Sequence, residues 1–255
     1  MIDLETAKRM QIPSGASASE RPKRILAVDD DLSTLALIER VLSDQGFTVW
    51  TAQSGQEALD RLKREGLPHL AIVDLLMPGM DGTTLCGSIK SFSDIPIIIL
   101  TAVGTKETLV DLLERYAEDY IVKPFDPREL AARVIRLLRR IGDFSYAADP
   151  IYEVDQHLSI DLPSQRAIVD GRSVNLTATE AKLLYLLVRG GARPVRTAYL
   201  LDRLWPGESV FEETLRVHIH RLRQKIEPAD GQRHYIVTER GYGYAFVQPG
   251  KSAPA

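Results

Sequence analysis

The chain has 255 residues, more than the roughly 100–200 residues of a typical single domain, so two domains are expected. Its formal net charge of -3 does not by itself indicate a nucleic-acid binder, although this average can conceal a local basic face. No apolar run is long enough to span a membrane, and residues 1–22 lack the charged start and apolar middle of a signal peptide. The single cysteine, Cys86, excludes an intramolecular disulfide and a thiolate metal cluster, so a cytoplasmic protein with no membrane partner is expected.

The first half of the chain alternates buried runs with helical patterns. Residues 1–22 are rich in Ser, Ala and Gly and are expected to be a disordered extension. A capping box of Ser54 and Glu57 opens one helix, and the last helix covers residues 126–140. The apolar runs between the helices are RILAVD, FTVWTA, HLAIVD, IPIIILT and DYIV. This alternation predicts an α/β doubly wound domain with a five-stranded parallel sheet over residues 23–141.

The second half has a different pattern. Residues 142–152 are expected to be a linker, and residues 158–176 alternate with turn signals as short antiparallel strands do. Thr177 and Glu180 form a second capping box, followed by helical patterns over residues 197–204 and 212–227 and a hairpin around Gly241. These elements predict a small α+β domain over residues 153–248, with residues 249–255 as a tail.

Three consecutive carboxylates, Asp29, Asp30 and Asp31, follow the first apolar run. Asp74 ends the third run, and the carboxyl ends of parallel strands meet at one edge of the sheet, where ligands of such folds bind. Carboxylates gathered there would repel one another unless a cation joined them, and hard oxygen ligands suit Mg²⁺. The alternative is a purely structural role, in which Asp29 and Asp31 only cap the next helix, and for Asp31 that interpretation is preferred.

A hydroxyl and a lysine are expected at the same edge. Thr101 ends the fourth run and Lys123 follows the fifth. Either residue alone would be ordinary, but together with the carboxylates they suit an incoming phosphoryl group. The constellation predicts phosphoryl transfer to a carboxylate, with Asp74 as the nucleophile because it precedes an irregular, exposed turn.

At these residues the chain resembles a known family. The stretches VDD, DLLMPGMDG, IIILTA and DYIVKPF are similar to the receiver domain of two-component response regulators. The stretches LTATEAKLLYLL, HIHRLRQKIEP and TERGYGYAF resemble the winged helix-turn-helix effector domain of the OmpR/PhoB family. The resemblance extends from Lys23 to Val247 and implies a regulator of transcription controlled by a histidine kinase.

The resemblance assigns roles to the residues of the acidic pocket. It implies that Asp74 accepts phosphate from the kinase, and that Asp30, Asp74 and the main-chain carbonyl of Leu76 hold Mg²⁺ while Asp29 closes the pocket. These four residues are the expected metal-site residues.

It also implies how the pocket responds to phosphate. Lys123 would contact the phosphoryl group, Thr101 would move to bond it, and Tyr120 would swing inward as the switch aromatic. The Lys123–Pro124 bond is expected to be cis. The positions that tune hydrolysis are the apolar Leu76 and Val103, so at most slow self-dephosphorylation is expected, and no dedicated enzyme activity.

The basic helix of the second domain is the expected DNA reader. A basic face is usually only a solvated surface, but the helix-turn-helix spacing and the arginine at a hairpin tip make a coherent footprint on double-stranded DNA. Trp205 is expected to be a core anchor. The expected DNA contacts are Thr214, Arg216, His218, His220, Arg221, Arg223, Lys225, Thr238, Arg240 and Tyr244.

Two features depart from the family pattern near this helix. Glu213 stands where an arginine is usual and could weaken DNA binding, with Arg216 as partial compensation. The loop over residues 206–213, which in the family touches RNA polymerase or a neighbouring subunit, is shorter and more acidic than usual.

The surface that family receivers use to form homodimers departs further. Leu109 replaces a basic residue, Arg115 replaces an acid, and Tyr116 replaces a helix-ending glycine. The affected pairs are Leu109 with Glu129 and Arg115 with Arg133, whereas Asp119 with Arg140 keeps the usual signs. The alternative explanation is sequence drift on a variable surface without functional consequence, because exposed ion pairs individually contribute little free energy.

These observations predict a phosphorylation-controlled, DNA-binding transcription factor that dimerises on activation and binds tandem half-sites. The alternative is an atypical receiver whose output is independent of phosphorylation or mainly a protein–protein interaction.

Overall fold

The computed structural model describes residues 22–102, 115–141, 151–228 and 234–248, with only the backbone of residues 140 and 141. The predicted extension (apart from residue 22), most of the predicted linker and the whole tail lie outside the described residues. Val103 and Leu109 lie outside them as well.

The N-terminal domain is built on a five-stranded sheet with the strand order β2-β1-β3-β4-β5, and every neighbouring pair is parallel. The predicted doubly wound sheet is therefore confirmed. Its central strands are apolar except at their ends, because both faces of the sheet are covered. The strands are β1 (Arg24–Val28), β2 (Thr48–Ala52), β3 (Leu70–Asp74), β4 (Ile97–Thr101) and β5 (Asp119–Val122).

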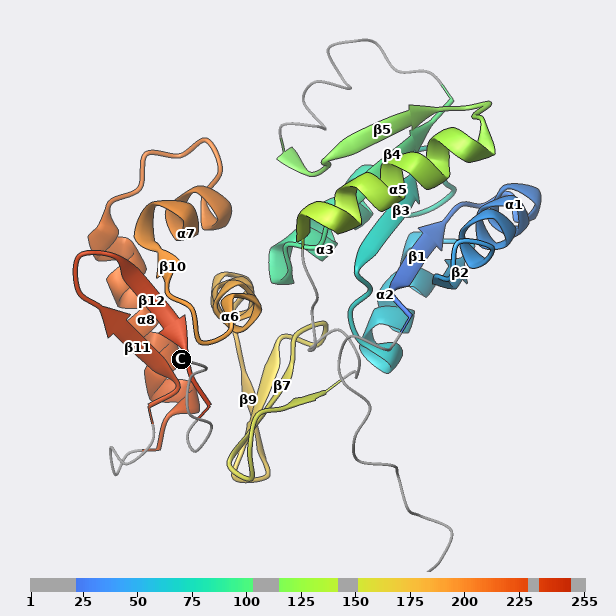
Figure 1. The fold of residues 1–255 in the computed structure, drawn as a ribbon. Coiled ribbons are helices and arrows are strands. Elements are labelled where there is room, and N and C mark those ends of the chain that lie inside the picture. The colour runs from blue at the N-terminus through green and yellow to red at the C-terminus, as the bar shows by residue number, and fades with distance from the viewer. Residues whose placement is uncertain (1–21, 103–114, 142–150, 229–233, 249–255) are drawn as a thin grey trace, which may run out of the picture.

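Within the described part of the chain, α1 (Leu32–Ser43) and α5 (Pro127–Ile141) lie on one face of this sheet and α2 (Gly55–Glu65) and α3 (Gly82–Phe92) on the other (Figure 1). Helices α1 and α5 bury their apolar stripes in one cluster with side chains of β1, β3, β4 and β5. Helices α2 and α3 bury theirs in the cluster on the opposite face. The parallel sheet needs both layers, because the apolar side chains of its central strands point to both of its faces.

The predicted caps fix where several helices begin. Asp31 is the N-cap of α1 and accepts a hydrogen bond from the backbone N–H of Ser33, which confirms the capping interpretation. Ser54 accepts a bond from the N–H of Glu57, whose carboxylate reaches the N–H of Gln53.

The C-terminal domain begins with an antiparallel sheet in the order β6-β7-β8-β9. Its strands are β6 (Tyr152–Glu153), β7 (Leu158–Asp161), β8 (Arg166–Val169) and β9 (Arg172–Asn175). Helix α6 (Ala178–Gly190) follows, and its predicted capping box is complete, with both reciprocal bonds between Thr177 and Glu180.

The rest of this domain has the arrangement of a winged helix-turn-helix. Helices α7 (Thr197–Leu204) and α8 (Glu212–Ile226) pack against each other and against α6. A small sheet of β10 (Val195–Arg196), β12 (Gly243–Phe246) and β11 (Ile236–Glu239) carries the hairpin, with Gly241 at φ 74° in its turn. The predicted α+β domain is confirmed.

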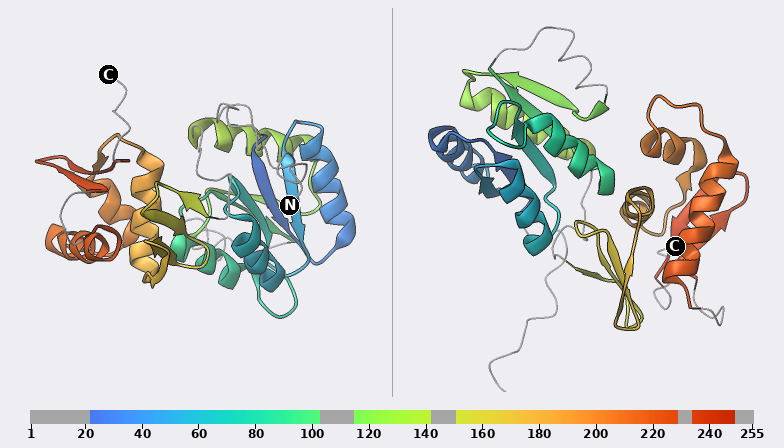
Figure 2. Two further views of the ribbon diagram at one scale, coloured as in Figure 1. Left: turned by 90° about the horizontal axis from the view of Figure 1, so that it is seen from below. Right: turned by 180° about the vertical axis from the view of Figure 1, so that it is seen from behind.

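Helix α6 lies next to α3 of the N-terminal domain, whereas α8 and the hairpin lie on the far side of the C-terminal domain (Figures 1 and 2). Among the helices of the described residues, none is both long and apolar enough to cross a membrane.

Candidate functional site

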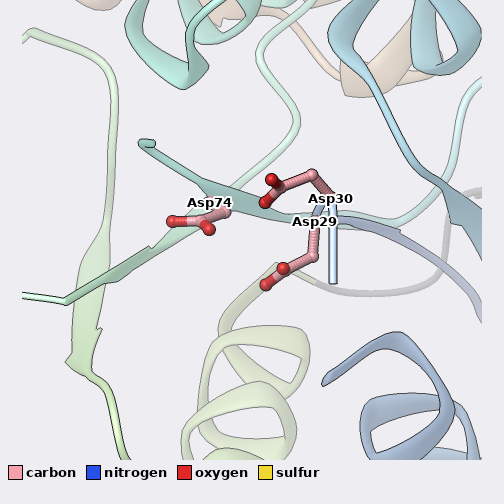
Figure 3. Close-up of side chains that lie close together, drawn as sticks. All are labelled: Asp29, Asp30 and Asp74. Carbon is pink, nitrogen blue, oxygen red and sulfur yellow. The ribbon is translucent and has the colours of Figure 1, made fainter. Parts of the chain in front are cut away.

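The predicted acidic pocket is formed at the carboxyl edge of the parallel sheet. Asp29 directly follows β1, and Asp74 is the last residue of the neighbouring strand β3. Carboxylate oxygens of Asp29, Asp30 and Asp74 lie within 4.8 Å of one another, and Figure 3 shows the three side chains together. The strand order, which puts β1 and β3 side by side, is what brings these residues together.

Lys123 joins two of these carboxylates. Its Nζ atom lies 2.7 Å from Oδ2 of Asp74 and 2.7 Å from Oδ2 of Asp29. Burial raises the pKa of Asp29, and the hydrogen bond to Lys123 offsets this only in part. Burial alone would lower the pKa of Lys123, but its bonds to Asp29 and Asp74 raise it. The pocket therefore holds a fixed cation beside the carboxylate that was predicted to be the nucleophile.

The backbone around Asp74 is closely packed. A Cβ atom built on Gly82, the first residue of α3, would lie 2.1 Å from the carbonyl oxygen of Asp74. The N–H of Gly82 donates to the carbonyl of Leu75 at 3.0 Å, and the N–H of Leu76 donates to Oδ1 of Asp74 at 3.3 Å. The Leu76 side chain is 66% exposed, so the mouth of the pocket has an apolar rim.

The two predicted switch residues lie on neighbouring strands. Thr101 is buried at the end of β4, and Tyr120 is partly buried in β5 with Ile99 as its partner in the sheet register. The N–H of Lys123 donates to the carbonyl of Thr101 at 2.7 Å, which ties the lysine loop to the end of β4. The Lys123–Pro124 bond is cis, as predicted.

The donor set of this pocket fits Mg²⁺. It offers carboxylate oxygens from Asp29, Asp30 and Asp74, with Asp30 exposed at the mouth. These are hard ligands, and their exposed side leaves room for water and phosphate oxygens, which Mg²⁺ usually retains.

A second feature is a groove of about 850 Å³ between α8 and the β11–β12 hairpin. Among the predicted DNA contacts, those with exposed side chains are Thr214, Arg216, His220, Arg221, Thr238 and Arg240. The groove is lined by side chains that include Arg216, Arg223, Arg240 and Tyr244.

Other predicted DNA contacts are engaged inside the domain. The ring of His218 packs on Trp205 with 5.3 Å between centroids, and burial followed by the charge of Arg221 lowers its pKa. Arg223 donates to the carbonyl of Ile236 at 3.0 and 2.7 Å and to Oγ1 of Thr238 at 2.9 Å.

Two further side chains are held in the same way. The Lys225 ammonium lies 2.6 Å from a carboxylate oxygen of Glu180, and Tyr244 is only 8% exposed. The structure thus separates the basic helix into side chains that face solvent and side chains that hold the domain together.

Sequence reasoning missed residues beside these exposed groups. Val217 is 46% exposed, three positions after Thr214 and three before His220, so helical periodicity places it on the same face of α8. Tyr242 is also exposed, and the guanidinium of Arg196 lies 5.5 Å from its ring centroid. The glycine-flanked position of Tyr242 in the hairpin tip was the signal that could have found it.

The surface expected to form dimers carries ion pairs within the chain. Arg133 donates to both oxygens of Asp119 at 2.8 and 3.0 Å and to Glu129 at 2.8 and 2.6 Å. Arg136 adds a 2.7 Å bond to Asp119. The acids expected to pair across a dimer are therefore both bound by Arg133 of the same chain.

Comparisons with known proteins agree with this architecture. Residues 25–135 match the family described as "Response regulator receiver domain", and residues 171–246 match "Transcriptional regulatory protein, C terminal". The "Probable transcriptional regulator ycf27" of Guillardia theta is 37% identical over 234 residues, which cover 89% of this chain and 91% of that protein.

Two further proteins are similar over nearly the same length. The "DNA-binding response regulator MtrA" of Mycobacterium leprae (strain TN) is 37% identical over 228 residues, 89% of this chain and 99% of that one. The solved structure of DrrB, a Thermotoga maritima OmpR/PhoB homolog, is 29% identical with a TM-score of 0.43, covering 89% of this chain and all of that chain.

The fold and its two sites define a response regulator, a receiver domain joined to a DNA-binding effector domain. The chain belongs to the OmpR/PhoB family of transcriptional regulators.

Proposed function

We propose that Asp74 is the phosphoacceptor and that a cognate histidine kinase phosphorylates it in a Mg²⁺-dependent reaction. The observation that carries this proposal is the convergence of Asp29, Asp30, Asp74 and Lys123 at one edge of the sheet. In the transfer, an oxygen of Asp74 forms a bond to phosphorus while the bond from phosphorus to the kinase histidine nitrogen breaks.

Each pocket residue has a distinct part in this step. Asp30, Asp74 and the main-chain carbonyl of Leu76 would hold the ion, with Asp29 closing the site; the bound ion would neutralise charge on the phosphoryl oxygens. Lys123 already contacts Asp74 and is placed to follow a phosphoryl oxygen. Thr101 and Tyr120 would transmit the change along β4 and β5. Because Leu76 offers no group that could orient a water molecule, self-dephosphorylation would be slow.

The output is binding to double-stranded DNA, with α8 in the major groove and the hairpin beside it. The exposed residues of this surface are the proposed contacts: Thr214, Arg216, His220, Arg221, Thr238 and Arg240. Arg216 lies 3.5 Å from Glu212 and 4.0 Å from Glu213, so it shields DNA phosphates from the unusual acid at position 213. Because the proposed output is binding to DNA, we expect the protein to act in the cytoplasm.

Phosphorylation would act by forming homodimers on tandem half-sites. The pairs between Arg133, Asp119 and Glu129 must be broken if the standard receiver surface is used, which favours assembly on DNA over assembly in solution. The loop after α7 would touch RNA polymerase, with Phe211, 78% exposed, as its apolar group.

The test combines light scattering with a DNA-binding assay on a pool of random duplexes. The protein is measured with Mg²⁺, with and without beryllofluoride as a phosphoryl mimic, and beside Asp74→Asn. We expect the mimic to raise the particle mass measured by light scattering, or the affinity for DNA, in the wild type but not in Asp74→Asn. Failure of the mimic to bind would contradict the assignment of the pocket. An Asp74→Asn variant with unchanged DNA binding would support an output independent of phosphate.

A further inference from the structure

The two domains meet through an ion-pair cluster centred on the buried Asp94, which the phosphorylation site and the DNA surface do not use. Asp94, two residues after α3, is only 4% exposed. Its Oδ2 atom accepts hydrogen bonds from Arg203 of α7 at 3.0 and 2.7 Å. Arg189 of α6 donates to the same atom at 3.4 Å. One receiver carboxylate therefore holds two arginines of the effector domain.

The cluster continues into the receiver. Lys90 of α3 donates to Glu118 at 2.9 Å and lies 3.9 Å from Oδ1 of Asp94. Glu118 in turn accepts from the N–H of Ile97 at 2.6 Å. Because Ile97 begins the strand that ends at Thr101, the cluster contacts the strand that carries the predicted switch hydroxyl.

Apolar packing surrounds the charges. A single buried cluster contains Ile89 and Phe92 of α3 together with Leu184 and Val188 of α6. Tyr116 lies on Gly87 of α3, where a Cβ atom would be 3.7 Å from the ring. Tyr116 also lines a cavity of about 210 Å³ between the domains, whose walls include Lys182 and Arg203. The tyrosine that departs from the family pattern is thus part of the contact between domains.

A contact of this kind holds well but can be released. Removing one partner of a buried charge pair leaves the other charge uncompensated, so Asp94 strongly favours the docked arrangement. Interfaces between domains of one chain are nevertheless small and polar compared with a domain core, and relative motion is the ordinary expectation.

Docking constrains orientation and does not cover the DNA surface. Helix α8 and the hairpin lie on the side of the effector domain that faces away from the receiver (Figure 2). If two docked chains formed a dimer through a twofold axis between receivers, the same axis would relate their α8 helices. Such a pair matches inverted half-sites, whereas tandem half-sites need two effector domains in the same orientation.

We propose that the Asp94 cluster is a latch between the domains, which must open in at least one chain of a dimer before both effector domains can bind tandem half-sites. The proposal rests on the proposed function for its DNA arrangement, but the latch itself does not. Opening would be favoured by changes at β4 and β5, through Ile97 and Glu118.

The latch is tested by measuring distances between the domains of the full chain. Spin labels are placed on Glu39→Cys in α1 and Ser173→Cys in β9, both exposed. Cys86 does not compete for label, because it is buried and burial raises its pKa to about 12. Pulsed electron paramagnetic resonance should give a narrow distribution of distances between the labels in the doubly labelled protein. The distribution should be broad when Arg203→Gln is added.

Arg166→Gln is the matched control, because the ion pair of Arg166 with Asp161 lies within the effector domain. It should leave the distribution narrow. Circular dichroism verifies that both variants fold. A second variant, Asp94→Asn, should broaden the distribution as Arg203→Gln does. A distribution that stays narrow in both variants, or that is already broad without them, would overturn the latch.

The consequence for DNA is measured with duplexes selected from the random pool and rebuilt with two half-sites in tandem or inverted order. Without beryllofluoride, Arg203→Gln should bind tandem sites on the order of 5- to 50-fold more tightly than the wild type. If Arg203→Gln broadens the distance distribution but binds tandem sites no more tightly than the wild type does, the docked contact exists but does not control DNA binding. Loss of the response to beryllofluoride in the wild type would count against the proposed function and leave the distance result as the test of the latch.

Discussion

The ammonium group of Lys123 lies 2.7 Å from the carboxylate of Asp74, although the two residues are separated by most of two βα units. The same ammonium is 2.7 Å from Asp29, so one cation offsets two buried acids. This relationship makes the stability of the receiver depend on the residue that is also proposed to bind the phosphoryl group.

Replacing Lys123 by Met should destabilise the receiver by about 1–3 kcal/mol at neutral pH, because two acids lose their charged hydrogen-bond donor. Added Mg²⁺ should restore part of this loss, since it binds the same carboxylates. Urea unfolding with and without Mg²⁺ measures both effects. Lys63→Met, which changes an exposed lysine of α2, is the control and should change stability little. Equal stability of the two variants would contradict the importance of the pair.

Replacing Gly82 by Ala should impair the pocket without changing any charged group. The new Cβ atom would meet the Asp74 carbonyl oxygen and must displace backbone, which costs about 1–3 kcal/mol. Uptake of phosphate from a small phosphodonor should slow in parallel. Gly87→Ala is the control, because its Cβ atom makes only an ordinary contact with Tyr116 inside a helix. If both variants took up phosphate at the same rate, the close packing would not matter for Asp74.

Replacing Arg133 by Gln should free Glu129, leave Asp119 with Arg136 as its remaining guanidinium partner, and lower stability by about 1–2 kcal/mol, because Asp119 is largely buried. The bonds to Glu129 and Asp119 raise the pKa of Arg133, which is consistent with a strongly held guanidinium. Arg139→Gln, an exposed change on the same helix, serves as the comparison. Thermal unfolding of both variants is the measurement, and no difference between them would argue that the pairs are too solvated to contribute.

Arg221 and Arg223 lie two positions apart on α8 but should behave differently. Arg221→Ala should weaken DNA binding and reduce its salt dependence by about one counterion, with little change in stability, because its side chain is exposed. Arg223→Ala should lower stability as well, since its guanidinium holds Ile236 and Thr238 at the start of the hairpin. Salt titrations of DNA binding combined with urea unfolding separate the two. Similar unfolding curves for both variants would contradict the distinction.

Lys182, at the cavity between the domains, should make stability depend on pH. Burial lowers its pKa from the ordinary 10.5 to about 8. Between about pH 8 and 10.5 the folded protein therefore binds fewer protons than the unfolded chain, and the contribution of Lys182 to stability rises with pH. Below about pH 8 the cost of holding the charged group in the fold is fully present. The charged groups around it are Lys90, Asp94, Glu118 and Arg203.

Lys182→Met should accordingly be more stable than the wild type at pH 7, and the difference should shrink as the pH rises towards 10.5. Urea unfolding of both proteins across this range is the measurement, with Lys63→Met to account for an exposed lysine. A difference that stays constant with pH would show that Lys182 is not the titrating group.

The sequence by itself determined the order of the strands and helices, most of the caps and the position of the acidic pocket. These features depend on local patterns and on one general rule, because parallel strands with covered faces bring their carboxyl ends to a common edge. Asp29, Asp74 and Lys123 could be predicted to meet for this reason, with no knowledge of which side chains touch.

Only the tertiary structure decided which charged groups are partners. Arg133 binds Asp119 of its own chain, Lys225 binds Glu180, and His218 packs on Trp205 although its helix was predicted to read DNA. The pairing of Asp94 with Arg203 likewise joins residues that share no periodic pattern. Such contacts follow from how whole elements pack, because a long charged side chain can reach several neighbours and burial selects one of them.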